Sequence, residues 1–323
     1  MLENLRRKSL VKTYHDPRYS IKFEQGHVIH REYISIGYHK QKLSKKETKN
    51  FFRGTFDGIS KEFGLIADTC ISHTYNDVEF NMIFCPSGTF TMGHDKDESG
   101  NKPRLETIER PFLLGETEVT QQLYQAVLGE NPSKSSQSYL APVETVSWFD
   151  AILFCNKLSK LQGFNECYVL TDISTIDEKG EDQKRIMSAK VTCDFEKNGY
   201  RLPKEKEWEY AAKAGTQNKY AGTDSERKLS EYAWFGEDWD RGSTYPVKKR
   251  KPNEWGFYDM SGNVEEWCWD RSYDSTYDAN LGVLRGGSYR NYSRFCKSTY
   301  SYKFFDYYAS VAQGFRVCRS LFS

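Results

Sequence analysis

The first clear pattern of apolar and polar positions lies near residue 80. A short apolar run over residues 82–85 is followed by a Pro-Ser-Gly turn and by residues 89–92, in which polar and apolar side chains alternate. Short apolar or alternating runs on either side of a turn are typical of two paired strands. The pattern therefore predicts a β-hairpin over residues 82–92.

Three later segments carry the signals of helices. Thr120 is a candidate N-cap for a helix over residues 121–128, and Ser147 is a candidate N-cap for a second helix. Pro203 precedes residues 204–214, which are rich in Glu, Lys and Ala and predict a third helix. Short aromatic segments separated by Gly, Pro and Asn follow. A few helices among many short strands predict an α+β fold.

The composition changes near residue 78. Residues 1–78 are rich in Lys, His and Tyr, and residues 45–63 have the pattern of an amphipathic helix interrupted by Gly54 and Gly58. We expect an N-terminal extension or small domain over residues 1–78, to which the sequence assigns no role. The main domain is expected over residues 79–323.

Charge and hydropathy exclude several kinds of partner. The chain has 46 Lys and Arg against 45 Asp and Glu, a net charge of +1, so no overall field attracts nucleic acid or a membrane. No apolar run reaches the ~20 residues of a membrane span, and the N-terminus lacks the apolar core of a signal peptide. We expect no nucleic-acid partner and no insertion of this chain into a membrane.

The eight cysteines are spread along the chain without a Cys-X-X-Cys pair. This spacing predicts neither a structural zinc site nor a disulfide framework. Most of the cysteines stand beside aromatic or aliphatic residues, as Cys85 does after Phe84. We expect them to be small buried apolar side chains.

Residues 259–267, DMSGNVEEW, bring carboxylates and backbone oxygens together around a glycine. Oxygen ligands in a tight turn suit a hard cation such as Ca²⁺, although the spacing is not that of an EF-hand. A turn held by side-chain hydrogen bonds of Asp259 and Asn263 explains the same pattern. Spacing alone leaves both interpretations open.

Residues 289–310 are dominated by Tyr and Phe, with Ser, Asn and Asp in many of the gaps. The segment has few aliphatic residues and no sustained period of two or 3.6, so it does not have the pattern of a core element. Its composition resembles that of an antibody paratope. The alternative is an ordinary core in which these aromatic rings are buried.

Eight ordered motifs across residues 81–319 resemble the formylglycine-generating-enzyme, or sulfatase-modifying factor, family. The resemblance implies a C-type-lectin fold of the α+β class. The motifs are PSGTFTMG at 86–93, ETEVT at 116–120, PVETVSW at 142–148, RLP at 201–203 continuing into EWEYAA at 207–212, PN at 252–253, GNV at 262–264, RGGSY at 285–289 and GFR at 314–316.

The resemblance also implies a calcium site in the Gly-Asn-Val loop. The implied ligands are the side chains of Asp259 and Glu266 and the carbonyl oxygens of Gly262 and Val264. A second calcium site of the family would fall at residues 234–240. The pattern is poorly kept there, so only one structural Ca²⁺ is expected.

The enzymes of this family oxidise a substrate cysteine with two cysteines that bind copper. The pair follows the Gly-Gly-Ser-Tyr motif, five residues apart. Here the first position is Asn291 and only Cys296 remains. Because Cu(I) needs two thiolates brought close together, we expect neither copper nor oxidase activity. The alternative is a formylglycine-generating-type oxidase, or a related enzyme that uses Cys296 alone.

The aromatic segment further resembles the diversified region of the variable proteins of diversity-generating retroelements, which use the same fold. Adenine mutagenesis converts AAY codons into NNY codons, which cannot encode Trp, Gln, Glu, Met or Lys. Residues 289–311 contain none of the first four, and Lys occurs only at 297 and 303. The resemblance implies a variable region at about 285–319 and a non-enzymatic, receptor-like binding protein.

Ser293, Cys296 and Thr299 are expected to be scaffold residues within this region. A third function, sugar binding, rests on analogy with lectins alone. The positions expected to vary and to contact the ligand are Arg290, Asn291, Tyr292, Arg294, Phe295, Tyr300, Tyr302, Phe305, Asp306, Tyr307 and Tyr308.

The expected partner is an unidentified macromolecule, a protein rather than a nucleic acid, bound by a monomer. The resemblance favours display at the cell surface through a leader that this sequence lacks. If the N-terminus is native as given, a cytoplasmic location is expected instead.

Overall fold

The computed structural model describes residues 12–16, 19–24, 27–35, 70–94, 102–135, 138–177, 184–237 and 242–321, the first three ranges by their backbone alone. The helix expected over residues 45–63 lies outside these ranges. Within them, no helix is long and apolar enough to cross a membrane.

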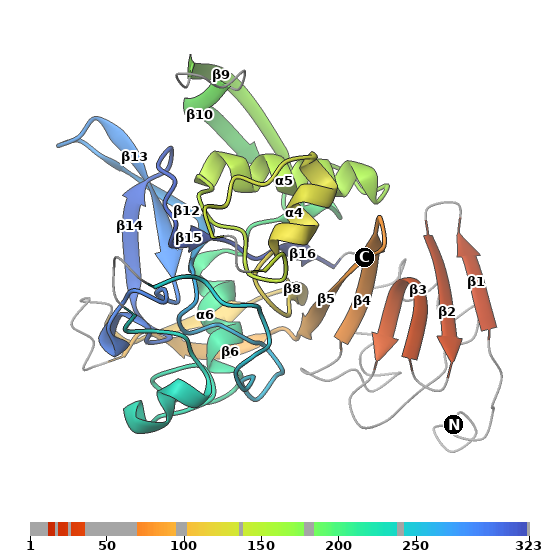
Figure 1. Ribbon diagram of the computed structural model, residues 1–323, viewed down its shortest axis with the longest axis horizontal. Helices are drawn as coiled ribbons and strands as arrows, with labels where there is room; N and C mark the ends of the chain where they lie inside the picture. Colours follow the sequence, from red (N-terminus) through yellow and green to blue (C-terminus); the bar gives the residue numbers. More distant parts are fainter. Residues whose placement is uncertain are drawn as a thin grey trace.

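An eight-stranded sheet extends from the middle of the molecule to the red strands of Figure 1, and each strand pairs antiparallel with the next. In spatial order the strands are β1 (Lys12–Asp16), β2 (Tyr19–Glu24), β3 (His27–Ser35), β4 (Cys70–Tyr75), β5 (Val78–Cys85), β8 (Phe112–Gly115), β16 (Cys318–Ser320) and β11 (Tyr200–Arg201).

The boundary expected at residue 78 falls inside a hairpin. β4 and β5 are joined by Asn76 and Asp77, both in the left-handed conformation, with φ of 46° and 61°. Cys70 pairs with Ile83 across the two strands. The main domain therefore includes β4, so the structured part begins before residue 79.

The predicted hairpin over residues 82–92 is wrong in its pairing. β5 pairs with β4 and β8, whereas β6 (Gly88–Met92) pairs with β7 (Arg104–Ile108). The end of β5 is buried at four consecutive positions, 82–85. Such a strand is covered on both faces, so its local pattern indicates a strand without indicating its neighbours.

The three predicted helices are confirmed. α4 (Gln121–Leu128) begins where the Thr120 hydroxyl accepts a hydrogen bond from the Leu123 amide, at 3.2 Å. α5 (Trp148–Leu161) begins with a reciprocal capping box between Ser147 and Asp150. α6 (Glu205–Lys213) follows Pro203. Their starts were predictable because caps act over three or four residues.

A four-stranded sheet carries the C-terminal aromatic segment, at the left of Figure 1. Two 3₁₀ turns, η1 (Glu226–Glu231) and η2 (Ser293–Phe295), belong to the loops. In spatial order the strands are β14 (Ser301–Phe305), β13 (Ala279–Arg285), β12 (Glu265–Asp274) and β15 (Gln313–Gly314).

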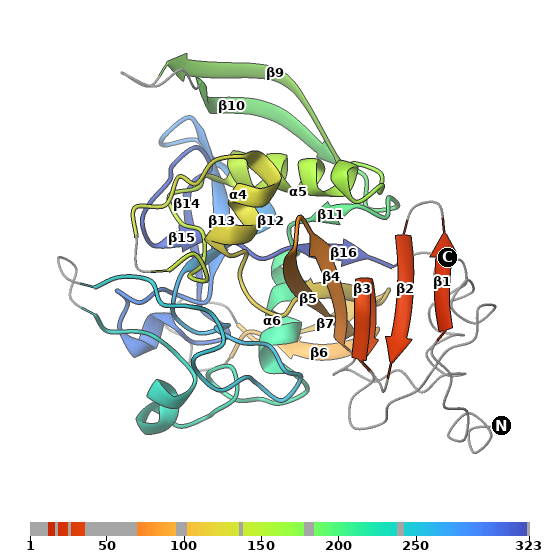
Figure 2. The same cartoon turned by 45° about the vertical axis from the view of Figure 1, so that its right-hand side comes forward.

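A separate hairpin stands away from the body above α5 (Figure 2). It is formed by β9 (Tyr168–Asp177) and β10 (Lys184–Cys193). Below it, fully buried Trp148, Trp267 and Phe315 belong to a core cluster that brings together α5, β12 and the Gly-Phe-Arg motif. The four-stranded sheet thus packs against this core through side chains of β12 and β13.

Candidate functional site

The backbone of residues 289–310 is fastened to other parts of the fold along its length. The bonds have donor–acceptor distances of 2.7–3.0 Å. Because these bonds use main-chain groups, they do not depend on which side chain a position carries. They run from Tyr289 N to Asn263 O, Glu237 N to Tyr289 O, Gly236 N to Asn291 O, Ser298 N to Lys219 O, Trp148 N to Asp306 O and Thr145 N to Ser310 O.

β14 forms one edge of the four-stranded sheet. Among the described residues its one strand neighbour is β13, with Tyr302 opposite Leu284 and Lys303 opposite Val283. The side chains of an edge strand are covered from fewer sides than those of a central strand. Accordingly Tyr302 and Lys303 are exposed to solvent, whereas Leu284 and Val283 are buried.

Most of the expected ligand-contacting positions reach solvent. Tyr292, Tyr302 and Tyr308 expose 67%, 40% and 44% of their surface. Arg294 is exposed as well. The half-buried positions are Arg290, Asn291, Phe295, Tyr300, Phe305 and Tyr307. The alternative of a wholly buried aromatic core does not describe this segment.

The rings gather into one aromatic surface, which we define as Tyr302, Phe304, Phe305, Tyr307 and Tyr308. Ring centres lie 5.8 Å apart for Tyr302 and Phe304, 4.8 Å for Phe304 and Tyr308, and 5.4 Å for Phe305 and Tyr307. Phe304 and Tyr307 also pack against the main core cluster. Phe304 and Tyr307 thus hold the aromatic surface on the core, while Tyr302 and Tyr308 remain exposed to solvent.

Two members of this neighbourhood were not predicted. Phe304 joins the rings of Tyr302 and Tyr308, and Tyr277 meets the ring of Phe305 edge-on at 5.4 Å. Tyr277 exposes 64% of its surface in the turn between β12 and β13. Two tyrosines among Asp, Ser and Thr, Tyr273 and Tyr277, were the available signal in the sequence, but only the pairing of β13 with β14 brings Tyr277 to the site.

Asp306 departs from the expected exposure. It is only 3% exposed, and its carboxylate lies 2.8 Å from Nη1 of Arg271, whose guanidinium stacks 4.1 Å from the ring of Trp148. Burial raises the pKa of Asp306, while Arg271 opposes that shift. Asp306 therefore supports the segment from within rather than facing a ligand.

The two positions that correspond to the copper-binding cysteines, Asn291 and Cys296, lie in a turn closed by hydrogen bonds. The side-chain oxygen of Asn291 accepts hydrogen bonds from the amide and the hydroxyl of Ser288, at 2.6 and 2.7 Å. Cys296 is fully buried, and its thiol lies 3.8 Å from the Tyr292 carbonyl oxygen. Burial raises the pKa of the Cys296 thiol, with a further contribution from the charge of Glu265.

We expect native Cys296 to react with iodoacetamide at least ~100-fold more slowly than in the urea-unfolded chain, because a buried neutral thiol is a poor nucleophile. Mass spectrometry of the peptide that contains Cys296 measures the rate. An Asn291→Cys variant is the matched control, since its thiol would sit at a half-exposed position and should react faster. Rapid labelling of native Cys296 would contradict the prediction.

Glu266, an expected calcium ligand, is bound by an arginine and a tryptophan. Its two oxygens lie 2.6 Å from Nε and Nη2 of Arg316, and Nε1 of Trp208 donates to one of them at 2.7 Å. Glu266 and Arg316 are both fully buried. The guanidinium already supplies the positive charge that calcium was expected to supply. In the described ranges, no group of three or more His, Cys, Asp or Glu residues could hold a metal.

The Gly-Asn-Val loop is held as a turn. The Asn263 side chain accepts from the Tyr245 amide at 3.0 Å and donates to the Tyr245 carbonyl at 3.2 Å, while Asp259 accepts from the Lys248 amide at 3.0 Å. The Gly262 amide donates to Gly286 O at 2.9 Å. These bonds favour the turn interpretation, and calcium binding by the side chains of Asp259 and Glu266 and the carbonyl oxygens of Gly262 and Val264 stays a prediction.

A second buried carboxyl group lies near this turn. Burial raises the pKa of Glu118 well above its usual value, and the charges of Asp259 and Glu266 add to the shift. Burial likewise raises the pKa of Asp259 to about 6. Arg316 is the common counter-charge for all three carboxyl groups. Of the three carboxyl groups only Glu266 is hydrogen-bonded to Arg316, whereas both carboxyl oxygens of Glu118 and Oδ1 of Asp259 are buried without a hydrogen-bond partner in the described ranges.

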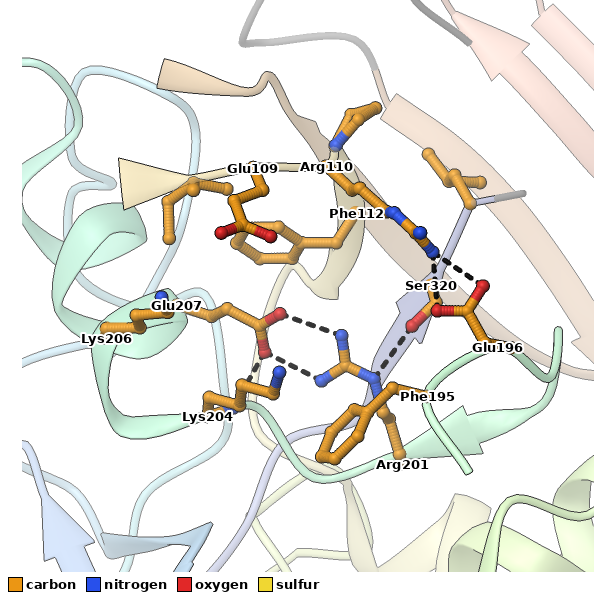
Figure 3. Close-up of a pocket in the computed structure, with 13 residues that line it drawn as sticks. Glu109, Arg110, Phe112, Phe195, Glu196, Arg201, Lys204, Lys206, Glu207 and Ser320 are labelled. Carbon is orange, nitrogen blue, oxygen red and sulfur yellow. Dashed lines mark hydrogen bonds and ion pairs between the residues drawn. The ribbon is translucent and has the colours of Figure 1, made fainter. Parts of the chain in front are cut away.

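A pocket of about 360 Å³ lies elsewhere, beside the start of α6 and the end of β16 (Figure 3). Four of its charged groups are paired with one another. Arg201 binds Glu207 through two hydrogen bonds of 2.7 and 2.8 Å and also donates to Ser320, and Arg110 binds Glu196 at 2.6 Å. No residue of 289–310 lines it. It offers no separate support for catalysis.

The chain is similar to known proteins over most of its length. The sulfatase-modifying factor enzyme 1-like domain matches residues 71–321. Chaperone protein LppX of Paenibacillus barcinonensis is 35% identical over 226 residues, which cover 65% of this chain and 80% of that protein. The mouse formylglycine-generating enzyme is 34% identical over 262 residues, covering 67% and 68%.

Among solved structures, Treponema denticola variable protein 1 is similar with a TM-score of 0.68 and 36% identity. The match covers 78% of this chain and 99% of that one. The resemblance to a variable protein of this fold is therefore confirmed.

Proposed function

Because the chain belongs to the family of sulfatase-modifying factor enzyme 1-like domains, we propose that it uses this fold to bind a macromolecular ligand rather than to catalyse a reaction. The observation that carries the proposal is an aromatic surface on a backbone fastened by main-chain hydrogen bonds. Such a backbone keeps its shape when side chains change, which lowers the entropy cost of binding. The similarity to a treponemal variable protein supports the same function.

The second candidate, an oxidase of the formylglycine-generating type, has relatives in its favour, including the mouse enzyme. The site argues against it. Asn291 stands where the resemblance implies a second thiol, and Cys296 is buried without access to a substrate. A single buried thiol with a raised pKa is a poor copper ligand and a poor nucleophile.

Diversification by a retroelement is the finer part of the proposal. It is supported by the absence of Trp, Gln, Glu and Met from residues 289–311. Sequencing the DNA around the gene tests it. We expect a near-copy of this segment that differs at adenines, together with a reverse transcriptase. A protein ligand, a monomeric state and display at the cell surface are further predictions from the same resemblance.

Two randomised libraries test whether the exposed side chains can change freely. One varies exposed Tyr292, Arg294, Tyr302 and Tyr308, and its control varies buried Cys296, Ser298, Thr299 and Asp306. We expect most members of the exposed library to fold, because surface substitutions usually change stability by less than about 0.5 kcal/mol. Members of the buried library should lose about 2–5 kcal/mol.

The measurement is protease resistance on yeast, followed by panning against lysozyme. The exposed library should yield members that bind lysozyme more tightly than the parent chain does. The proposal would be contradicted if the exposed library unfolded as often as the buried one, because the backbone would then depend on those side chains.

A further inference from the structure

Residues 289–310 are basic within a chain whose charges balance. The segment contains Arg290, Arg294, Lys297 and Lys303, and its one acidic residue is Asp306. Because Asp306 is buried against Arg271, its charge does not face solvent. The charge that the segment itself presents to a ligand is therefore positive.

Two of the four cations are exposed to solvent, one in η2 and one in the middle of β14. Arg294 and Lys303 are exposed, and within the described ranges neither forms an ion pair. The Arg294 guanidinium lies 4.6 Å from the ring centre of Phe295 and 5.7 Å from that of Tyr292. A guanidinium stacked on rings keeps its N–H groups free to bind a carboxylate through two hydrogen bonds.

Acidic side chains lie at the border of this region. Glu226 accepts a hydrogen bond from the Ser293 hydroxyl, and Asp278 accepts one from the Tyr273 hydroxyl. Glu265 contributes, after burial, to the raised pKa of Tyr302, but burial raises the pKa of Glu265 itself to about 7, so it adds less negative charge than Glu226 and Asp278. Border acids repel a long polyanion such as a nucleic acid, whereas single carboxylates can pair with Arg294 and Lys303 between them.

We propose that this surface recognises an acidic protein segment in which Asp or Glu side chains are interspersed with apolar ones. The inference rests on the proposed binding function and adds the chemistry of the partner. Carboxylates pair with Arg294 and Lys303, and apolar side chains cover the rings of Tyr302 and Tyr308.

The experiment uses random 15-residue peptides displayed on yeast and panned with the full chain. The measured quantity is the mean net charge of the enriched peptides relative to the starting pool. We expect enriched peptides to be acidic and to contain aromatic or aliphatic residues. Their binding should fall at least about tenfold in 1 M NaCl, where the Debye length is about 3 Å.

A charge-reversal variant with Arg294→Glu and Lys303→Glu should shift the enrichment to basic peptides. The matched control carries Lys157→Glu and Lys160→Glu, which change the net charge equally at exposed positions of α5. The control should still select acidic peptides. Selection of basic peptides by the control as well would overturn the inference, since net charge alone would then explain the preference.

Other outcomes separate this inference from the proposed function. Neutral or basic peptides enriched by the parent, or no enrichment, would overturn the acidic partner. If the parent bound neutral or basic peptides and lost them with Tyr302→Ala and Tyr308→Ala, the proposed binding function would stand. Tighter binding of a 20-nucleotide oligo(dT) than of any acidic peptide would overturn the inference in favour of a nucleic acid. If acidic peptides still bound after both Tyr302→Ala and Tyr308→Ala, the aromatic surface would not be their binding site and the inference would be overturned.

Discussion

Replacing Glu266 by glutamine is expected to lower the free energy of unfolding by about 3–5 kcal/mol, because it leaves the buried Arg316 guanidinium without its counter-charge. Both side chains are fully buried, and two hydrogen bonds of 2.6 Å join them. Glutamine keeps the size of the side chain, so the loss would report the charge rather than a cavity. Urea unfolding followed by tryptophan fluorescence measures the change.

The matched control is Glu231→Gln, which breaks an ion pair with Lys251 at the surface. That change should cost less than about 1 kcal/mol. The same curves recorded in EDTA and in millimolar Ca²⁺ test the calcium interpretation. We expect the parent to be equally stable in both. A parent that loses several kcal/mol in EDTA, while Glu266→Gln is indifferent to calcium, would contradict the role given to Arg316.

Gly262→Ala is expected to destabilise the protein by more than about 4 kcal/mol, a size that indicates a specific steric cause. A Cβ at residue 262 would lie 2.0 Å from the carbonyl oxygen of Trp234, and φ is +83°. The obstructing atom belongs to the backbone, and Asn263 N donates to it at 2.9 Å. The collision therefore cannot be relieved by a rotamer change.

Gly129→Ala is the control that isolates the collision. Gly129 has a similar φ of +89°, but nothing lies within 4 Å of a Cβ built there. It should cost only the left-handed conformation, about 1–2 kcal/mol. Thermal and urea unfolding of both variants give the comparison. Equal losses would mean that the contact with Trp234 relaxes and that backbone conformation alone explains the glycine.

Local signals explain which parts of the fold were predictable. The starts of α4 and α5 depend on Thr120 and on Ser147 with Asp150, whose partners lie within three residues. Strand pairing depends on distant segments. Nothing in residues 82–92 reveals that β5 lies between β4 and β8, or that β6 pairs with β7.

The candidate site shows the same division. Composition identified the aromatic segment, but it could not separate buried Asp306 from its exposed neighbours, because the deciding partner is Arg271 on β12. The sequence could not weigh the calcium interpretation against the turn interpretation for a similar reason. Acidic and carbonyl oxygens around Gly262 are visible in the sequence, whereas the cation that binds Glu266 comes from Arg316, fifty residues away.

β14 has a consequence for the behaviour of the protein at high concentration. An edge strand presents unpaired main-chain groups, and Tyr and Phe on either side make it a template for strand-to-strand aggregation. Lys303 occupies the middle of this strand and is exposed. A charge there opposes stacking of like strands. Lys303 would therefore limit aggregation through this otherwise aromatic edge strand.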